Sequence, residues 1–348
     1  MIDPKGHLAK SPWRMPAAAW KDIAARTYKR TWDDNVGIVA AGVAFYGFFA
    51  LLSLLGLIVL SYGMVADPHT VITNMRTLTG VLPRDVALLI GDQLMNAVKA
   101  SEGTKGFAIA LAFAVAIYGG TNGAAAILTA LNIAYEEKEK RSLLRFYILA
   151  VGMTVGALLL ALVALVAVAL VSGLQRFFPA ASYGSVLAGK AAGYLFVTLF
   201  GAAVAATLYR FGPSRTMARW KWISPGSIFA AITLLILTVA FGYYVARFTN
   251  YDRTYGSLGT VVALLSWMYL SAYAFIFGAE LNSEIEHQTA HDSTVGRPKP
   301  LGRRGAWAAD NVASDAKVQD RPEESREGER LTAAAPQLAC DEGSGGGK

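Results

Sequence analysis

The stretch GIVAAGVAFYGFFALLSLLGLIVLSY, residues 37–62, contains no Asp, Glu, Lys or Arg. About 20 apolar residues of α-helix cross a bilayer hydrocarbon core about 30 Å thick, so this stretch is long enough to span a membrane. Five further runs have the same character, and a backbone surrounded by lipid must satisfy its own hydrogen bonds. We therefore predict a transmembrane domain, residues 37–286, with six helical spans at about 37–62, 106–133, 146–172, 188–209, 226–247 and 257–280.

The composition favours a membrane protein over a water-soluble one. Of the 348 residues, 54% are hydrophobic and only 16% are charged, whereas a soluble domain has about 25% charged residues. Six core helices of a soluble globule would need far more polar chain around them. The predicted fold class is an all-α polytopic membrane protein with amphipathic flanking helices and a disordered C-terminal tail. The lone Cys340 excludes an intramolecular disulfide and a cysteine-based zinc cluster.

Basic residues predict the orientation of the spans, because short cytoplasmic loops are enriched in Lys and Arg. The N-terminal segment, residues 1–36, holds seven of them, and the links after the second and fourth spans hold four each. The links after the third and fifth spans hold only two each. Both termini are therefore predicted to face the cytoplasm, with the first span retained rather than cleaved. These flanks account for the net charge of +7, so no nucleic-acid partner is expected.

Three segments outside the spans have their own patterns. WKDIAARTYKRTW, residues 20–32, has an apolar and a basic face, which predicts an interfacial helix on an anionic cytoplasmic leaflet. A soluble amphipathic helix packed on other loops is the alternative. Residues 82–100 form a second amphipathic stretch, predicted to lie on the outer membrane surface or to cap the bundle. Residues 287–348 are polar and rich in Gly, Ala, Pro and mixed charges, which predicts a disordered cytoplasmic tail.

The spans carry neutral polar side chains but almost no charge. Lys190 alone lies close to the body of a span, where it can reach headgroups by snorkelling. The absence of buried Asp, Glu or His argues against a proton relay. The polar side chains either form interhelical hydrogen bonds in a tightly packed bundle or line a cavity. The candidates are Tyr46, Ser53, Thr121, Asn122, Thr129 and Asn132.

FIFGAELNSEIEHQTAH, residues 275–291, combines acidic and imidazole side chains at helical spacing. Glu280, Glu284, His287 and His291 share one helix face, which raises the question of a metal or acid–base site. A metal needs three or four converging ligands, and one straight helix presents at most two. We therefore favour a helix that leaves the membrane and becomes solvated. Glu280 would then pair with an arginine of the preceding link, and Arg215 and Arg219 are the candidates.

Catalytic patterns are missing elsewhere in the sequence. We find no Ser-His-Asp set, phosphate-binding glycine loop or paired catalytic carboxylates, so we expect no enzyme, no cofactor and no metal.

The last third of the chain resembles the YihY/BrkB family of bacterial inner-membrane proteins. The resemblance rests on YRFGPSRTMARWKWISPGSIFAA (209–231) and YGSLGTVVALLSWMYLSAYAFIFGAELN (255–282), with support from AAGVAFYGFFALLSL (40–54) and LTALNIAYEE (128–137). It covers about residues 20–286. The sequence departs from the family pattern after Ser53, where Leu54 replaces an expected proline. The motif residues are Tyr255, Gly256, Ser257, Gly259, Trp267, Gly278, Glu280 and Asn282.

The resemblance implies a six-span protein of the bacterial inner membrane and three unlike functions. The family has been labelled a ribonuclease, which we regard as a misassignment, and has been given roles in virulence or serum resistance and in transport of lipid or lipopolysaccharide precursors. We favour translocation of a lipid or amphiphilic envelope component, passive or partner-driven because nothing in the chain hydrolyses ATP. The alternative is a non-transporting scaffold for envelope assembly. A lipid-accessible groove lined by Asn122, Thr129 and Tyr46 would favour transport. The oligomeric state, the substrate and the partner have no signal in the sequence.

Overall fold

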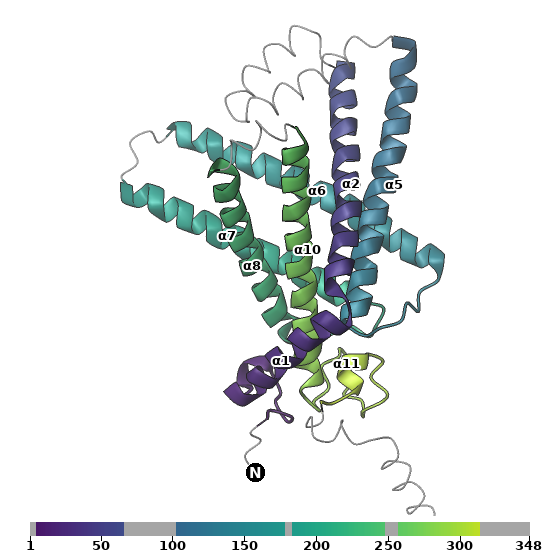
Figure 1. The fold of residues 1–348 in the computed structure, drawn as a ribbon, viewed down its shortest axis with the longest axis vertical. Coiled ribbons are helices and arrows are strands. Elements are labelled where there is room, and N and C mark those ends of the chain that lie inside the picture. The colour runs from purple at the N-terminus through teal and green to yellow at the C-terminus, as the bar shows by residue number, and fades with distance from the viewer. Residues whose placement is uncertain (1–4, 66–101, 178–182, 248–256, 314–348) are drawn as a thin grey trace, which may run out of the picture.

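The computed structural model describes residues 5–65, 102–177, 183–247 and 257–313, and the regular elements in this part of the chain are helices joined by irregular links (Figure 1). Two bridging residues, Ala218 and Thr294, make its one isolated β-type contact. The elements are η1 (Pro12–Arg14), α1 (Ala17–Asp33), α2 (Val36–Val65), α5 (Glu102–Ala134), α6 (Leu143–Phe177), α7 (Tyr183–Phe211), α8 (Trp220–Arg247), α10 (Ser257–His287) and α11 (Trp307–Asp310).

Each of the six long helices contains one of the predicted spans. Within the described residues, five of them are long and apolar enough to cross a membrane alone. The sixth, α2, forms a bent pair with α1, and the two helices meet at 65°. Asn35 makes this bend with a φ of 50°, a left-handed conformation that asparagine tolerates better than most residues. The all-α polytopic membrane fold is therefore confirmed.

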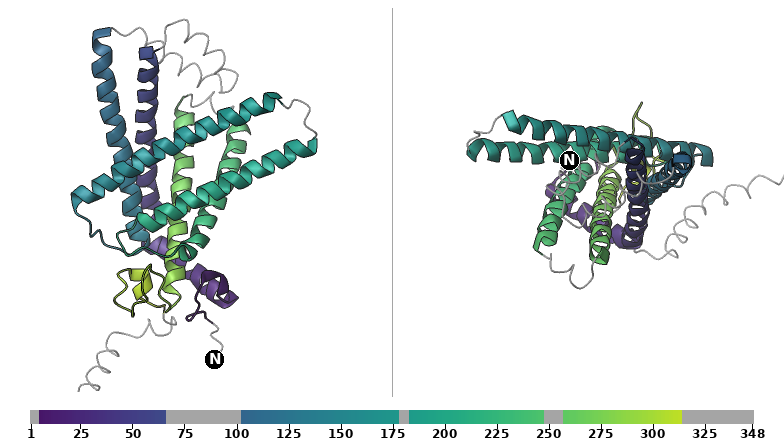
Figure 2. Two further views of the ribbon diagram at one scale, coloured as in Figure 1. Left: turned by 180° about the vertical axis from the view of Figure 1, so that it is seen from behind. Right: turned by 90° about the horizontal axis from the view of Figure 1, so that it is seen from above.

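The helices form a row with a tilted pair behind it. Helices α5, α2, α10 and α8 stand side by side in that order, and each contacts the next (Figure 1). In the view from the back (Figure 2, left), α6 and α7 cross in front of this row at a steep tilt. Helix α6 contacts α5, and α7 contacts α8. The described part of α7 exposes apolar side chains from Tyr194 to Phe200, as expected for a surface that faces lipid.

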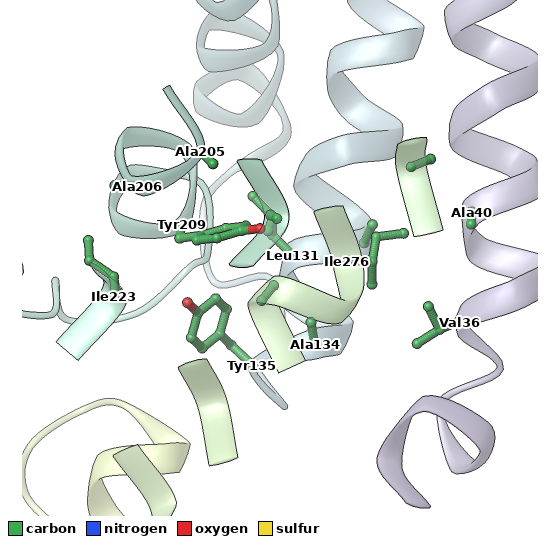
Figure 3. Packing of buried hydrophobic residues seen from close by; sticks show 14 of the residues in the cluster. Val36, Ala40, Leu131, Ala134, Tyr135, Ala205, Ala206, Tyr209, Ile223 and Ile276 are labelled. Atoms are coloured by element: carbon green, nitrogen blue, oxygen red, sulfur yellow. The ribbon is translucent and has the colours of Figure 1, made fainter. Parts of the chain in front are cut away.

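The packed core lies where the row converges, near the end of the bundle that carries α1 and residues 288–313. We call this end the base. Small side chains let the helices approach, and the larger Tyr135, Tyr209 and Ile276 fill the space between them (Figure 3). The Tyr209 hydroxyl donates to the backbone oxygen of Phe275 at 2.7 Å, which joins α7 to α10.

Asn282 ties α10 to the first turns of α8. Pro225 lies inside α8 and has no N–H to donate. The Asn282 amide accepts from the Gly226 N–H at 2.8 Å and donates to the Ile223 oxygen at 2.9 Å. Its side chain is fully buried. An amide thus supplies backbone hydrogen bonding at a point where a proline interrupts the helical pattern.

The predicted disordered tail, residues 287–348, begins too early in the chain. Residues 288–313 fold back against the base rather than forming a disordered segment. Thr289 donates to the Ala9 oxygen at 2.8 Å, Arg304 to the Ala290 oxygen at 2.7 Å, and the Trp307 N–H to Glu137 at 2.7 Å. The polar composition misled the prediction because these polar groups satisfy one another and the base. Residues 314–348 and the amphipathic stretch 82–100 lie outside the described residues.

Helix α1 packs on the protein with the face that we predicted to rest on a membrane. Ile23 is fully buried against Trp222 and Ile285, which agrees with the alternative of a helix packed on other segments. Tyr28 and Trp32 remain exposed on the same helix.

Candidate functional site

The acidic face of α10 is buried, so the predicted solvated helix exit is wrong. Glu280, Glu284 and Glu286 are 1%, 2% and 0% exposed. Helix α10 continues to His287, past residue 280, where we placed the end of the span, as the helical spacing of its acidic residues predicts. Helix α1, the α5–α6 and α7–α8 links and residues 288–313 surround its end. The hydrophobicity of the sequence predicts where the span ends, but it does not predict which segments pack around the end of the helix.

Two arginines of α1 hold Glu284. Arg26 Nε donates to Glu284 Oε2 at 2.6 Å, and Arg30 Nε lies 3.5 Å from Oε1. Arg30 also pairs with Glu136 and stacks over the Trp307 ring at 5.1 Å. From the sequence, we assign both arginines to the cytoplasmic side and to the basic face of an interfacial helix, and not to a carboxylate partner. Their spacing of four residues, which places them on one face of α1, was the signal that they share a partner.

Arg215 pairs with Glu286, not with Glu280 as predicted. Arg215 Nη2 donates to Glu286 Oε1 at 2.6 Å, and both side chains are fully buried. Ser293 donates to the second oxygen of Glu286 at 2.6 Å, and the Arg215 guanidinium lies 4.3 Å above the Tyr135 ring. Arg219 is also not the partner of Glu280, because it donates to the backbone oxygens of Thr294 and Gly296.

Glu280 has a different environment from its acidic neighbours. It lies near the carboxyl groups of Asp34 and Glu284 and near the Arg30 guanidinium. Among the described residues, its Oε1 atom has no hydrogen-bond partner. Glu280 thus has an acceptor atom without a donor in the described part of the chain, whereas Glu284 and Glu286 bind arginines.

The histidines serve contacts in the base. His287 Nδ1 lies 3.3 Å from Glu284 Oε2, and its ring lies 5.1 Å from that of Trp307. The backbone N–H of His291 donates to the Thr289 hydroxyl at 3.1 Å. In the part of the chain that is described, no three His, Cys, Asp or Glu side chains are placed to hold a metal ion.

A hollow of about 700 Å³ lies between α5 and α6. Thr121 and Asn122, two of the predicted polar candidates, line it together with Tyr118 and Tyr147. Its remaining walls are Phe113, Ala114 and Ile117, and none of the lining residues is charged. The Thr121 hydroxyl has no hydrogen-bond partner among the described residues. The hollow therefore offers polar groups within an apolar wall.

The other candidates lie elsewhere. Tyr46 is 43% exposed on α2, and the Thr129 hydroxyl donates to the Ala125 oxygen of its own helix at 2.9 Å. Asn132 is in the base, where it donates to Glu139 and accepts from the Ser214 N–H. The side chain of Ser53 lies outside the described residues. Of the three residues expected to line a lipid-accessible groove, Asn122, Thr129 and Tyr46, only Asn122 lines the hollow.

The family-motif residues serve mainly the packing of α10. Gly278 lies against Gly226 of α8, and Trp267 Nε1 lies 3.4 Å from the Thr238 hydroxyl of α8. Gly259 is in the first turn of α10. Ser257 begins α10, while Tyr255 and Gly256 fall outside the described residues.

Glu139, in the link between α5 and α6, joins the ends of two helices. Burial alone would raise the pKa of Glu139, but hydrogen bonds from Arg141 and Asn132 outweigh it and lower the pKa to about 2. Asn132 lies 2.9 Å from the carboxylate and accepts the Ser214 N–H at 2.7 Å, so the α7–α8 link belongs to the same network.

A Glu139→Gln variant is expected to lose a pH-dependent part of its stability. The folded pKa lies below the ordinary value of 4.5, so the carboxylate stabilises the fold above about pH 4.5 and this effect fades as the pH falls toward 2. Thermal unfolding in detergent, followed from about pH 6 to pH 3, should show wild type and variant converging. A difference that stays constant over this range would contradict the assignment.

The family comparison identifies the chain. The family described as virulence factor BrkB matches residues 27–301, most of the sequence. The chain belongs to the BrkB virulence-factor family. The match begins in α1 and ends beyond α10, so the BrkB region includes the base as well as the spans.

Relatives of this BrkB-family protein are named as membrane proteins or as ribonuclease-like. It is 24% identical to a UPF0761 membrane protein of Rhodospirillum centenum over 304 residues, 85% of this chain and 64% of that protein. A UPF0761 membrane protein of Delftia acidovorans is 25% identical over 291 residues, 78% of this chain and 64% of that protein. YfkH of Bacillus subtilis, named as ribonuclease-like, is 32% identical over 173 residues, 48% of this chain and 62% of that protein. The chain thus spans less than two thirds of each relative, and no solved structure matches it.

Proposed function

We propose that this BrkB-family protein translocates a lipid or another amphiphile of the cell envelope across the bacterial inner membrane. The observation that carries the proposal is the hollow between α5 and α6. Two tyrosines, a threonine and an asparagine line it beside apolar side chains, a combination suited to a ligand with a polar head and an oily tail. No charged group lines it, so the movement is passive or driven by a partner.

The base is proposed to face the cytoplasm. The N-terminal helix α1, the α5–α6 and α7–α8 links and residues 288–313 all lie at this end (Figure 1), and each of these segments carries Lys or Arg residues. Basic segments are retained on the cytoplasmic side. The exposed Tyr28 and Trp32 of α1, next to Lys29, would lie at the anionic surface of the inner leaflet.

Reconstitution tests the proposal. Purified protein in lipid vesicles is expected to accelerate the exchange of a fluorescent lipid between leaflets, measured by quenching of the outer leaflet. Asn122→Leu should slow the exchange, because it removes a polar group from the hollow. Thr207→Val is the matched control, since Thr207 is an exposed residue of α7 outside the hollow whose hydroxyl donates to the Ala203 oxygen.

The outcome separates two functions. Exchange no faster than in empty vesicles, with folded protein, would contradict translocation and favour the scaffold for envelope assembly. Equal slowing by both variants would show that the effect does not depend on the hollow.

A further inference from the structure

A second hollow, of about 560 Å³, lies in the base and is lined by four cations. Lys140 and Arg141 come from the α5–α6 link, Arg210 from the end of α7, and Arg215 from the α7–α8 link. None of the lining residues is acidic. Segments far apart in the sequence thus bring positive charge to one point.

Three of these cations have carboxylate partners outside the lining. Lys140 pairs with Glu137 at 2.9 Å, Arg141 with Glu139 at 2.8 Å, and Arg215 with Glu286 at 2.6 Å. The remaining positive charge is that of Arg210.

Arg210 is the cation of the hollow whose surroundings differ most from those of the others. In the described part of the chain it forms no ion pair, and its Nε and Nη1 atoms are buried without a hydrogen-bond acceptor. Its guanidinium lies 4.4 Å from the Trp220 ring and 5.5 Å from the Phe211 ring. These ring contacts hold the guanidinium plane, while Nε and Nη1 have no acceptor among the described residues.

Arg215 adds a second set of unused donors. Its side chain is fully buried, and one nitrogen bonds Glu286 while Nε and Nη1 have no acceptor among the described residues. Buried N–H groups without acceptors are costly. Two of the residues around one hollow thus have buried guanidinium donors without an acceptor among the described residues, and an anionic ligand would supply that acceptor.

We infer that the basal hollow binds a phosphate group, carried either by the headgroup of an anionic lipid or by a soluble phosphate ester. Guanidinium groups match the oxygen geometry of phosphate better than an ammonium does. Phe211, Met217 and Trp220 are half-exposed around the hollow or beside it, so a lipid could keep its tails in an apolar setting. Basic pockets between membrane helices are suited to headgroups. The inference that this hollow binds phosphate is independent of the proposed translocation.

Titration calorimetry of the full chain in neutral detergent tests the site with three probes: dihexanoylphosphatidylglycerol, dihexanoylphosphatidylcholine and glycerol phosphate. We expect the phosphatidylglycerol to bind more tightly than the phosphatidylcholine, and Arg210→Gln to weaken this binding roughly tenfold or more. Arg297→Gln, which removes one exposed charge from the base outside the hollow, should leave binding unchanged.

The arms identify the source of the phosphate. Binding of phosphatidylglycerol alone assigns a lipid headgroup, whereas binding of glycerol phosphate with the same dependence on Arg210 assigns a soluble ester. Equal binding of the two lipids, or unchanged binding in Arg210→Gln, would overturn the inference. If Arg210→Gln does not fold, the same binding measurement on Arg210→Lys tests the site. It keeps the charge without the planar fork and should weaken binding several-fold, and unchanged affinity would again overturn the site.

Discussion

Replacing Glu286 with alanine is expected to destabilise the protein by about 3–5 kcal/mol, because it leaves a buried guanidinium without its counter-charge. Arg215 and Glu286 are both fully buried, and the pair is joined at 2.6 Å. Ser293 would also lose the acceptor of its hydroxyl. The measurement is the unfolding temperature of the purified protein in detergent, together with the yield of monodisperse protein.

Two controls separate the buried pair from charge in general. Glu136→Ala removes a carboxylate from the partly exposed pair with Arg30, whose side chains are 27% and 31% exposed, so its cost should be within about 1 kcal/mol. A double variant, Arg215→Met with Glu286→Leu, should recover much of the stability that Glu286→Ala loses. Equal losses in Glu286→Ala and Glu136→Ala would show that burial of the pair does not matter.

Replacing Gly226 with alanine is expected to cost about 1–3 kcal/mol or more, because two helix backbones meet at this position. A Cβ atom on Gly226 would collide with the Gly278 backbone oxygen and lie 2.6 Å from Cγ of Asn282. The backbone of α10 cannot move aside to relieve this collision, as the end of a flexible side chain can. The Asn282 hydrogen bond to the Gly226 N–H would be displaced as well. Thermal unfolding in detergent measures the loss.

Gly242 provides the matched control for this prediction. It lies on the same helix, and a Cβ atom there would meet nothing within 4 Å. Gly242→Ala should therefore be neutral or stabilising by up to about 1 kcal/mol, since alanine is the better helix former. If both alanine variants unfold at the wild-type temperature, the crossing of α8 and α10 is looser than the structure shows.

The crossing of α5 and α6 determines which polar side chains border the larger hollow. Asn122 and Thr129 are seven residues apart, near the same face of α5, yet only Asn122 lines the hollow. Helix α6 crosses α5 near Gly120, where a Cβ atom would collide with the Thr154 side chain. Helical spacing therefore predicted a shared face, but the position of that crossing decided which polar group borders open space.

The sequence alone determined the spans. Charge-free runs such as residues 37–62 must become helices in a bilayer because lipid offers the backbone no hydrogen-bond partner. This constraint acts locally, residue by residue, and so can be read without knowing which helices become neighbours.

Only the tertiary structure decided what happens to charge at the base. Glu280 and Glu286 are six residues apart, about 9 Å along a helix, and the arginine that we assigned to the first pairs with the second. Residues 288–313 are polar enough to suggest disorder, yet Ser293 of this segment donates to the buried Glu286 carboxylate. Burial of a charge depends on partners distant in the chain, and local composition does not contain that information.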